Sequence, residues 1–291
     1  MSTPIILKIV FDEGSSSPFI ARLFMGLLEL RDQLYLSGVN ENQKAEMESY
    51  FNRQFHPMLE AAWATKDAAA EVISLVDSHA KSIEEGRAVR INGNQLSIFE
   101  TIDKPLGQAI DKLLDQSVVA IKSGLQTILR DPLGLDIGFL FKRDTPFNNG
   151  IASLQANGEG DLGVYLQEVR ENWSKDLIDL RVAHEHEGWT LEKITYHLDE
   201  NNMLSVRIPM LATLPVNKFA RYTANRVLFF IENIMAYAIQ RKSSDTYLLY
   251  ISEIPVENRD IEAPKRFRIA ARGLINLKPW KIEYRDDLDF L

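Results

Sequence analysis

Apolar residues at helical spacing run through most of this chain, and this feature constrains its fold more than any other. In residues 98–130 they recur every three or four positions. Such a repeat places an apolar stripe along one side of a helix, and the stripe must be buried against other elements. Similar patterns predict helices over residues 18–36, 41–85, 162–187 and 216–241. The sequence therefore predicts a helical bundle.

Glycine and proline predict where these helices end. Pro57 lies inside the helix predicted over 41–85 and is expected to kink or break it, because proline removes a backbone hydrogen bond. Residues 143–163 are rich in Gly, Asn and Asp, which is typical of a linker or a long mobile loop. Gly188 follows the helix predicted over 162–187 and provides its C-terminal stop.

Alternation of apolar and polar residues predicts a smaller amount of β structure. Residues 193–208 read as a hairpin around the turn DENN, and Ile5–Phe11 reads as a short strand. Beyond residue 243, the stretches TYLLYISEIP, RFRIAARG and PWKIEYRD all read as strands. The predicted fold class is therefore mainly α (α+β), a helical bundle with an inserted β hairpin and a small C-terminal β segment.

These patterns divide the chain into four predicted parts. Residues 1–142 contain the N-terminal strand and a helical region, and residues 143–163 form the linker. Residues 164–242 contain the later helices together with the hairpin, and residues 243–291 form the C-terminal β segment.

Composition limits the classes of function. The chain of 291 residues has 33 basic and 41 acidic side chains, a net charge of −8, so its mean field repels nucleic acid and anionic membranes. It has no cysteine, which excludes thiol nucleophiles and thiolate metal sites and fits a cytoplasmic setting. No apolar stretch is long enough to predict a membrane span. The phosphate-loop, dinucleotide and nucleophile-elbow motifs are absent, so no cofactor is predicted.

The sequence LRVAHEHEGW, residues 180–189, contains the strongest candidate site. A structural interpretation accounts for all of it. His184 continues the apolar stripe as a half-buried core residue, and both His184 and His186 lie in the last helical turn, where the helix dipole favours positive charge. Arg181 lies four residues before Glu185 and is expected to pair with it.

A functional interpretation rests on the spacing of Arg181 and His186. They form an R-x4-H pattern, preceded by WSKDLIDLR and followed, after the hairpin, by the long helix FFIENIMAYAI. Over residues 160–242 this resembles the HEPN superfamily, whose helical bundles contain an Arg, four to six residues and then a His. One position departs from the pattern, because Val182 stands where active members usually have a polar residue.

The resemblance implies metal-independent cleavage of RNA by a homodimer in a bacterial defence or toxin-type system, with an antitoxin-like protein as a candidate partner. His186 would transfer the proton and Arg181 would bind the phosphate, with His184 and Glu185 as binding residues beside them. In a regular helix, residues five apart diverge by about 140°. The two side chains therefore meet only if the helix ends or distorts between them, or if a second subunit completes the site.

Other interpretations remain open. A non-catalytic helical interaction or scaffold protein is the alternative to the ribonuclease. Metal binding by His184 and His186 is disfavoured, since residues two apart on a helix point about 200° apart, and no metal site is predicted. Arg266 and Arg268 on a predicted strand are candidates for binding phosphate or RNA, or are the polar face of an edge strand.

Overall fold

The computed structural model describes most of the chain. The described residues are 22–23, 26–30, 32, 40–99, 101–123, 125–126, 140, 143–198, 200, 203–243, 249–261, 264–271 and 277–286. The strand expected at Ile5–Phe11 lies outside them, as does most of the helix expected over 18–36. The described residues confirm the predicted fold class, since long helices alternate with two-stranded antiparallel hairpins.

The chain forms two compact units. The larger unit contains residues 48–234 and 282–288, and the smaller contains 1–47, 235–281 and 289–291. Among the described residues, no helix has the length and apolar character that crossing a membrane requires.

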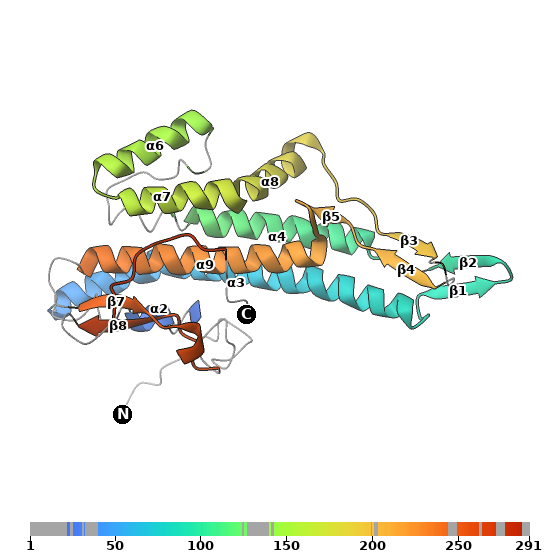
Figure 1. Cartoon of the computed structure of the whole chain (residues 1–291), viewed down its shortest axis with the longest axis horizontal. Coiled ribbons are helices and arrows are strands. Elements are labelled where there is room, and N and C mark those ends of the chain that lie inside the picture. The colour runs from blue at the N-terminus through green and yellow to red at the C-terminus, as the bar shows by residue number, and fades with distance from the viewer. Residues whose placement is uncertain are drawn as a thin grey trace, which may run out of the picture. The chain divides into compact units, whose positions relative to one another are not determined.

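Long helices build the larger unit (Figure 1). They are α3 (Glu41–Glu84), α4 (Asp103–Ser123), α6 (Asp144–Ala156), α7 (Gly160–Val169), α8 (Lys175–Glu187) and α9 (Val216–Ser243). The first residues of α3 and the last residues of α9 belong to the smaller unit. A π-helical turn, Arg170–Ser174, joins α7 to α8. The core contains aromatic side chains from several helices: Phe230 of α9 lies 6.4 Å from Tyr165 and 6.3 Å from Trp173, measured between ring centroids.

Two hairpins extend from one end of these helices (Figure 1). Strands β1 (Val89–Asn92) and β2 (Gln95–Ile98) pair around the Asn92-Gly93-Asn94 turn, directly after α3. Strands β3 (Thr195–Leu198) and β4 (Leu204–Arg207) form the predicted second hairpin. The Tyr196 hydroxyl hydrogen-bonds to Nε2 of His79 at 2.8 Å, which fastens this hairpin to α3 near its C-terminal end. A third, very short hairpin, β5 (Met210–Leu211) with β6 (Leu214–Pro215), precedes α9.

The smaller unit contains α2 (Gly26–Leu30) and the antiparallel pair β7 (Leu249–Glu253) and β8 (Phe267–Ala271), with a short 3-10 turn at Val256–Asn258. Trp280 packs edge-on against Phe267, with ring centroids 5.1 Å apart. Its backbone N–H donates to the carbonyl of Ile251 at 2.7 Å. The C-terminal β segment expected from the sequence is therefore confirmed for β7 and β8.

The prediction of a loop over residues 143–163 is wrong, because Asp144–Ala156 is helix α6 and α7 begins at Gly160. Phe147, Ile151 and Leu154 of α6 are buried. A Cβ at Gly163 of α7 would lie 3.6 Å from Leu154 and 3.7 Å from Ile151, so the glycine permits the two helices to approach closely. Packing against α7 therefore outweighs the loop-like composition.

Three further expectations need correction. The expected break at Pro57 is wrong, since α3 continues through it to buried Met58 and beyond, whereas the expected kink stays a prediction. Ile98 belongs to strand β2 rather than to the helix that follows. The stretch PWKIEYRD forms no strand, although Trp280 is buried, because among the described residues its backbone bonds to β7 only through Trp280 and Ile251, without a continuous ladder.

Candidate functional site

The candidate site lies at the C-terminal end of α8. Gly188 adopts the left-handed conformation with φ of 69°, which confirms the predicted helix stop, and the backbone N–H of Trp189 bonds to the carbonyl of Ala183. His184 and His186 therefore lie in the last turn, as the sequence predicted.

Arg181 is held between two carboxylates on different helices. Its Nε donates to Oδ1 of Asp115 on α4 at 3.1 Å, and its Nη2 lies 2.6 Å from Oε1 of Glu185 on α8. The pairing of Arg181 with Glu185 that the sequence predicted is confirmed. Because both sides of the guanidinium contact anionic groups, Arg181 has little capacity left for a phosphate.

His184 bridges α8, α4 and the chain beyond the helix. Its Nε2 lies 3.1 Å from Oδ1 of Asp111, and its Nδ1 lies 3.2 Å from the carbonyl oxygen of Trp189. Both partners are acceptors, so a protonated imidazole donates to each of them. The side chain is one-third exposed, which confirms the half-buried placement.

His186 is the accessible member of the group. Its side chain is 71% exposed, and its Nε2 lies 3.8 Å from Oε2 of Glu185. Arg181 and His186 therefore approach the two oxygens of one carboxylate from different sides. The structure brings the two predicted catalytic residues near one anionic group, but that group is the Glu185 carboxylate of the protein itself rather than a substrate phosphate.

Sequence reasoning missed the two α4 carboxylates that complete the cluster. Asp111 and Asp115 are four residues apart, so they share one face of α4, which packs against α8. Burial raises the pKa of the Asp111 carboxyl, the nearby His184 lowers it, and the like charge of Asp115 raises it further. The four-residue spacing was the available signal, but it does not reveal which helix supplies the partner.

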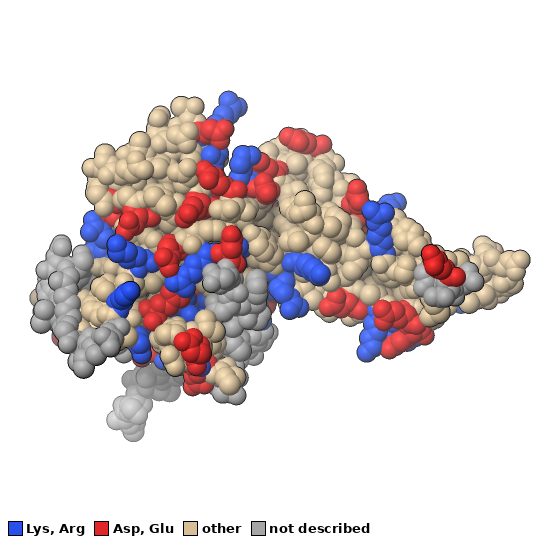
Figure 2. Space-filling view, viewed as in Figure 1, with Lys and Arg blue, Asp and Glu red and all other residues tan. Residues whose placement is uncertain are grey.

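The cluster as a whole is not electropositive. Asp111, Asp115 and Glu185 supply three carboxylates, against one guanidinium and two imidazoles. Even with both imidazoles protonated, no net positive charge results. On the face seen in Figure 2, acidic and basic side chains are also interspersed over helices α6 to α8 rather than gathered in a basic patch.

The other predicted binding residues belong to the smaller unit. Arg266 is 2% exposed, its Nε donates to Oε1 of Glu253 at 2.9 Å, and its guanidinium lies over Phe267. Arg268 is exposed on β8. The buried ion pair holds Arg266 inside its unit, so the two arginines do not form a shared phosphate site.

Among the described residues, no group of three or more histidine, aspartate or glutamate side chains is arranged to hold a metal ion. No protein-family model matches the chain, and neither a curated protein nor a solved structure matches it significantly.

Proposed function

We propose that this chain is a non-catalytic helical interaction protein, in which the Arg181 cluster fastens α8 to α4. The observation that carries the proposal is the position of the Arg181 guanidinium between Asp115 and Glu185. A phosphodiester would have to displace one of these carboxylates and would meet repulsion from the other two of the cluster. RNA cleavage needs the opposite arrangement, a cation that is free to stabilise developing negative charge.

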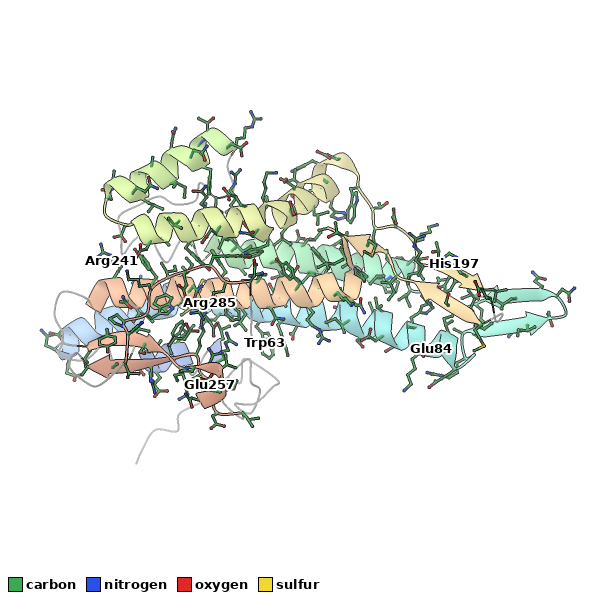
Figure 3. The ribbon with its side chains drawn as sticks, viewed as in Figure 1. Trp63, Glu84, His197, Arg241, Glu257 and Arg285 are labelled. Atoms are coloured by element: carbon green, nitrogen blue, oxygen red, sulfur yellow. The ribbon has the colours of Figure 1, made fainter. Side chains whose placement is uncertain are left out.

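The end of the larger unit that bears the hairpins offers a surface for association. Ile91 is 71% exposed, Phe99 58%, Leu198 57% and Met203 65%. Figure 3 marks this end by Glu84 at the end of α3 and His197 on β3. Exposed apolar side chains that lie close together are typical of interaction surfaces.

A second copy of this chain is the partner that we propose for the hairpins. Strands β1 to β4 contain no acidic residue although the chain has a net charge of −8, so repulsion between copies is weak here. A two-stranded hairpin is marginally stable alone, and pairing of its open edge with the same edge of another copy extends the sheet. In a dimer with two-fold symmetry, the open edge of the hairpin in each copy pairs with the same edge in the other copy.

Sedimentation velocity of the full chain tests the homodimer. We expect wild type to associate, and Ile91→Asp and Phe99→Asp to remain monomeric. Val164→Asp is the matched control, because Val164 is 52% exposed on α7, away from the hairpins, and should still associate. A monomeric wild type, or equal loss in the control, would overturn association through the hairpins.

A second candidate function is favoured by a specific observation. Arg181 and His186 approach the two oxygens of the Glu185 carboxylate, so one anionic group reaches both residues, as RNA cleavage requires. In this candidate, a phosphate replaces that carboxylate and RNA is the partner of a HEPN-like dimer in a bacterial defence or toxin-type system with an antitoxin-like protein. A cytoplasmic location is part of both proposals.

RNA degradation by the purified chain in the presence of a chelator separates the two candidates. The interaction protein predicts no degradation by wild type or by His186→Ala. The ribonuclease predicts degradation that His186→Ala abolishes and Glu185→Gln increases, because the amide releases the guanidinium. Arg221→Gln is the control, since Arg221 is exposed on α9 and belongs to neither the Arg181 cluster nor the hairpins.

A further inference from the structure

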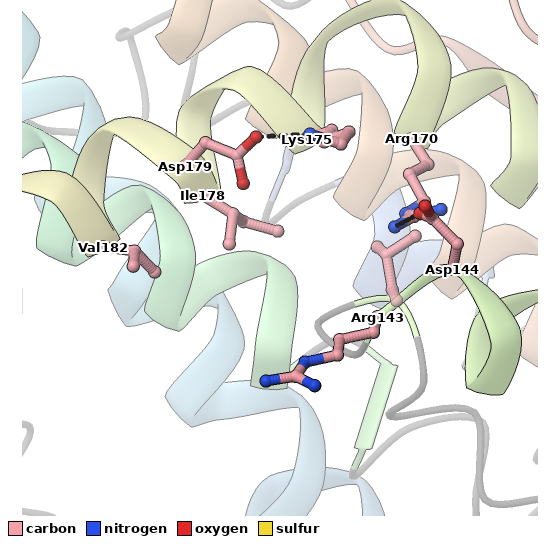
Figure 4. Close-up of a pocket in the computed structure, with 8 residues that line it drawn as sticks. Arg143, Asp144, Arg170, Lys175, Ile178, Asp179 and Val182 are labelled. Carbon is pink, nitrogen blue, oxygen red and sulfur yellow. Dashed lines mark hydrogen bonds and ion pairs between the residues drawn. The ribbon is translucent and has the colours of Figure 1, made fainter.

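A cleft between the start of α6 and the side of α8 collects basic side chains. Its volume is about 400 Å³, and Arg143, Arg170 and Lys175 line it (Figure 4). Ile178 and Val182 supply an apolar wall. The volume lies within the range of small-molecule sites, and the lining combines a few charged groups with apolar surface, as such sites do.

The π-helical turn explains how Arg170 and Lys175 face the same cleft. In an α-helix, residues five apart diverge by about 140°. Here the backbone N–H of Lys175 donates to the carbonyl of Arg170. This hydrogen bond spans five residues and places Lys175 nearly above Arg170 along the helix axis. Turns of this kind occur frequently at functional sites.

The three cations differ in what holds them. The Arg170 guanidinium lies 4.3 Å from the centre of the Phe147 ring and 2.7 Å from Oδ1 of Asp144, so it is fixed in position. Lys175 pairs with Asp179 at 2.5 Å, a hydrogen bond that raises the pKa of the Lys175 ammonium. Within the part of the chain that the structure describes, Arg143 makes no ion pair, and its guanidinium extends away from the charged ends of Arg170 and Lys175 (Figure 4).

The start of α6 adds to the positive potential. Arg143 is the residue before the helix and makes no capping bond through its side chain. The first turn of a helix has backbone N–H groups without intrahelical acceptors, and its dipole favours an anion. With three cations and two carboxylates, the charges lining the cleft leave one positive charge, in contrast to the Arg181 cluster.

We propose that this cleft binds a small phosphorylated ligand, with its phosphate at Arg170 and Lys175, its apolar part against Ile178 and Val182, and the exposed Arg143 side chain turning toward the phosphate on binding. In the absence of ligand, Asp144 pairs with Arg170 and Asp179 pairs with Lys175, so these two carboxylates compete with the phosphate. Lys175, Ile178, Asp179 and Val182 follow one stripe of α8, which adjoins the stripe of Arg181 and Glu185. The cleft shares no lining residue with the Arg181 cluster, so ligand binding here goes beyond both functions proposed above.

Isothermal titration calorimetry of the full chain tests the site with phenyl phosphate, inorganic phosphate and phenol as probes. We expect phenyl phosphate to bind more tightly than inorganic phosphate, and phenol not to bind. Arg143→Gln should weaken phenyl phosphate binding about tenfold or more, the loss of one charge-assisted contact. Arg221→Gln, an exposed position on α9, is the control and should leave binding unchanged.

A variant that removes negative charge provides the sharper test. Asp179→Asn frees the Lys175 ammonium, so phenyl phosphate should bind several-fold more tightly, a gain that loss of structure does not produce. Weaker or unchanged binding in Asp179→Asn would overturn the proposal. Equal binding of phenol and phenyl phosphate, or binding that Arg143→Gln does not change, would also overturn it.

Discussion

Arg181 on α8 and Asp115 on α4 are joined by a hydrogen bond of 3.1 Å although 66 residues separate them in the chain. Glu185 contacts the same guanidinium at 2.6 Å from within α8. The long-range bond, together with that between His184 and Asp111, connects two helices whose polar faces would otherwise both be solvated. The positions that suggested a reaction centre thus join two helices of the bundle.

The first prediction concerns this connection. Arg181→Gln and Asp115→Asn should each lower the free energy of unfolding modestly, since both side chains are partly exposed. A double-mutant cycle in urea should give a coupling energy of about 0.5 kcal/mol at low salt. The coupling should approach zero at high salt, because mobile ions screen exposed pairs. Arg221→Gln is the control, and a coupling that resists salt would contradict the partly exposed geometry.

The second prediction concerns the end of α8. Gly188→Ala should lower the free energy of unfolding by about 1 to 2 kcal/mol, because a side chain disfavours the left-handed conformation at φ of 69°. No atom lies within 4 Å of the added Cβ, so the cost is conformational and not steric. Urea denaturation provides the measurement.

Gly107→Ala within α4 is the matched control for that substitution. Its added Cβ is equally unobstructed, but its backbone is ordinary helix. The substitution should raise the free energy of unfolding by about 0.5 to 1 kcal/mol. If both substitutions changed the free energy of unfolding in the same direction, the left-handed backbone at Gly188 would not explain the loss.

The third prediction concerns the aromatic core of the larger unit. Phe230 is 1% exposed and lies between Tyr165 and Trp173. Phe230→Ala should lower the free energy of unfolding by about 3 to 5 kcal/mol, through lost burial and the cavity left behind. Val164→Ala, at a side chain that is 52% exposed, should change it by less than about 0.5 kcal/mol. A small loss for Phe230→Ala would indicate that α7 and α9 do not depend on this contact.

The fourth prediction concerns alkaline pH. Burial raises the pKa of the Tyr284 hydroxyl well above its ordinary value of 10.0, and the hydrogen bond to Asp286 raises it further. Above pH 10 the unfolded chain loses this proton while the folded chain retains it, so stability is present below that pH and falls as pH rises. Relative to Tyr284→Phe, wild type should lose unfolding free energy as pH rises above 10, with a limiting slope of about 1.4 kcal/mol per pH unit that solvent screening of this partly exposed group lowers.

Urea denaturation of both proteins between pH 9 and pH 12 measures this difference. The comparison with Tyr284→Phe removes the contribution of the other tyrosines, which both proteins share. A difference between the two proteins that stays constant across this range would contradict a raised pKa at Tyr284.

Local patterns were sufficient for features that depend on neighbours in the chain. The periodicity of residues 162–187 predicted the α7–α8 helical segment, and Gly188 predicted its end, because a left-handed stop is a property of one residue. The hairpin of β3 and β4 followed from alternation around a turn. The π-helical turn within the segment was not predicted, since no residue type in Arg170–Ser174 signals it.

Composition gave the wrong secondary structure where burial of apolar side chains determines it. Asn, Gly and Asp in residues 143–163 indicated a loop, yet Ile151 and Leu154 gain enough from packing at Gly163 of α7 to form a helix. Conversely, PWKIEYRD alternates like a strand but makes no ladder, because strand formation needs a partner edge along its length.

The sequence by itself determined the helical class, the inserted hairpin and the pairing of Arg181 with Glu185, because each depends on residues a few positions apart. Tertiary structure alone decided that Asp111 and Asp115 meet α8, and that Arg143 lies in one cleft with Arg170 and Lys175. The physical reason is that charge partners on different helices are chosen by how apolar faces pack. That packing is not encoded in the spacing of any single segment.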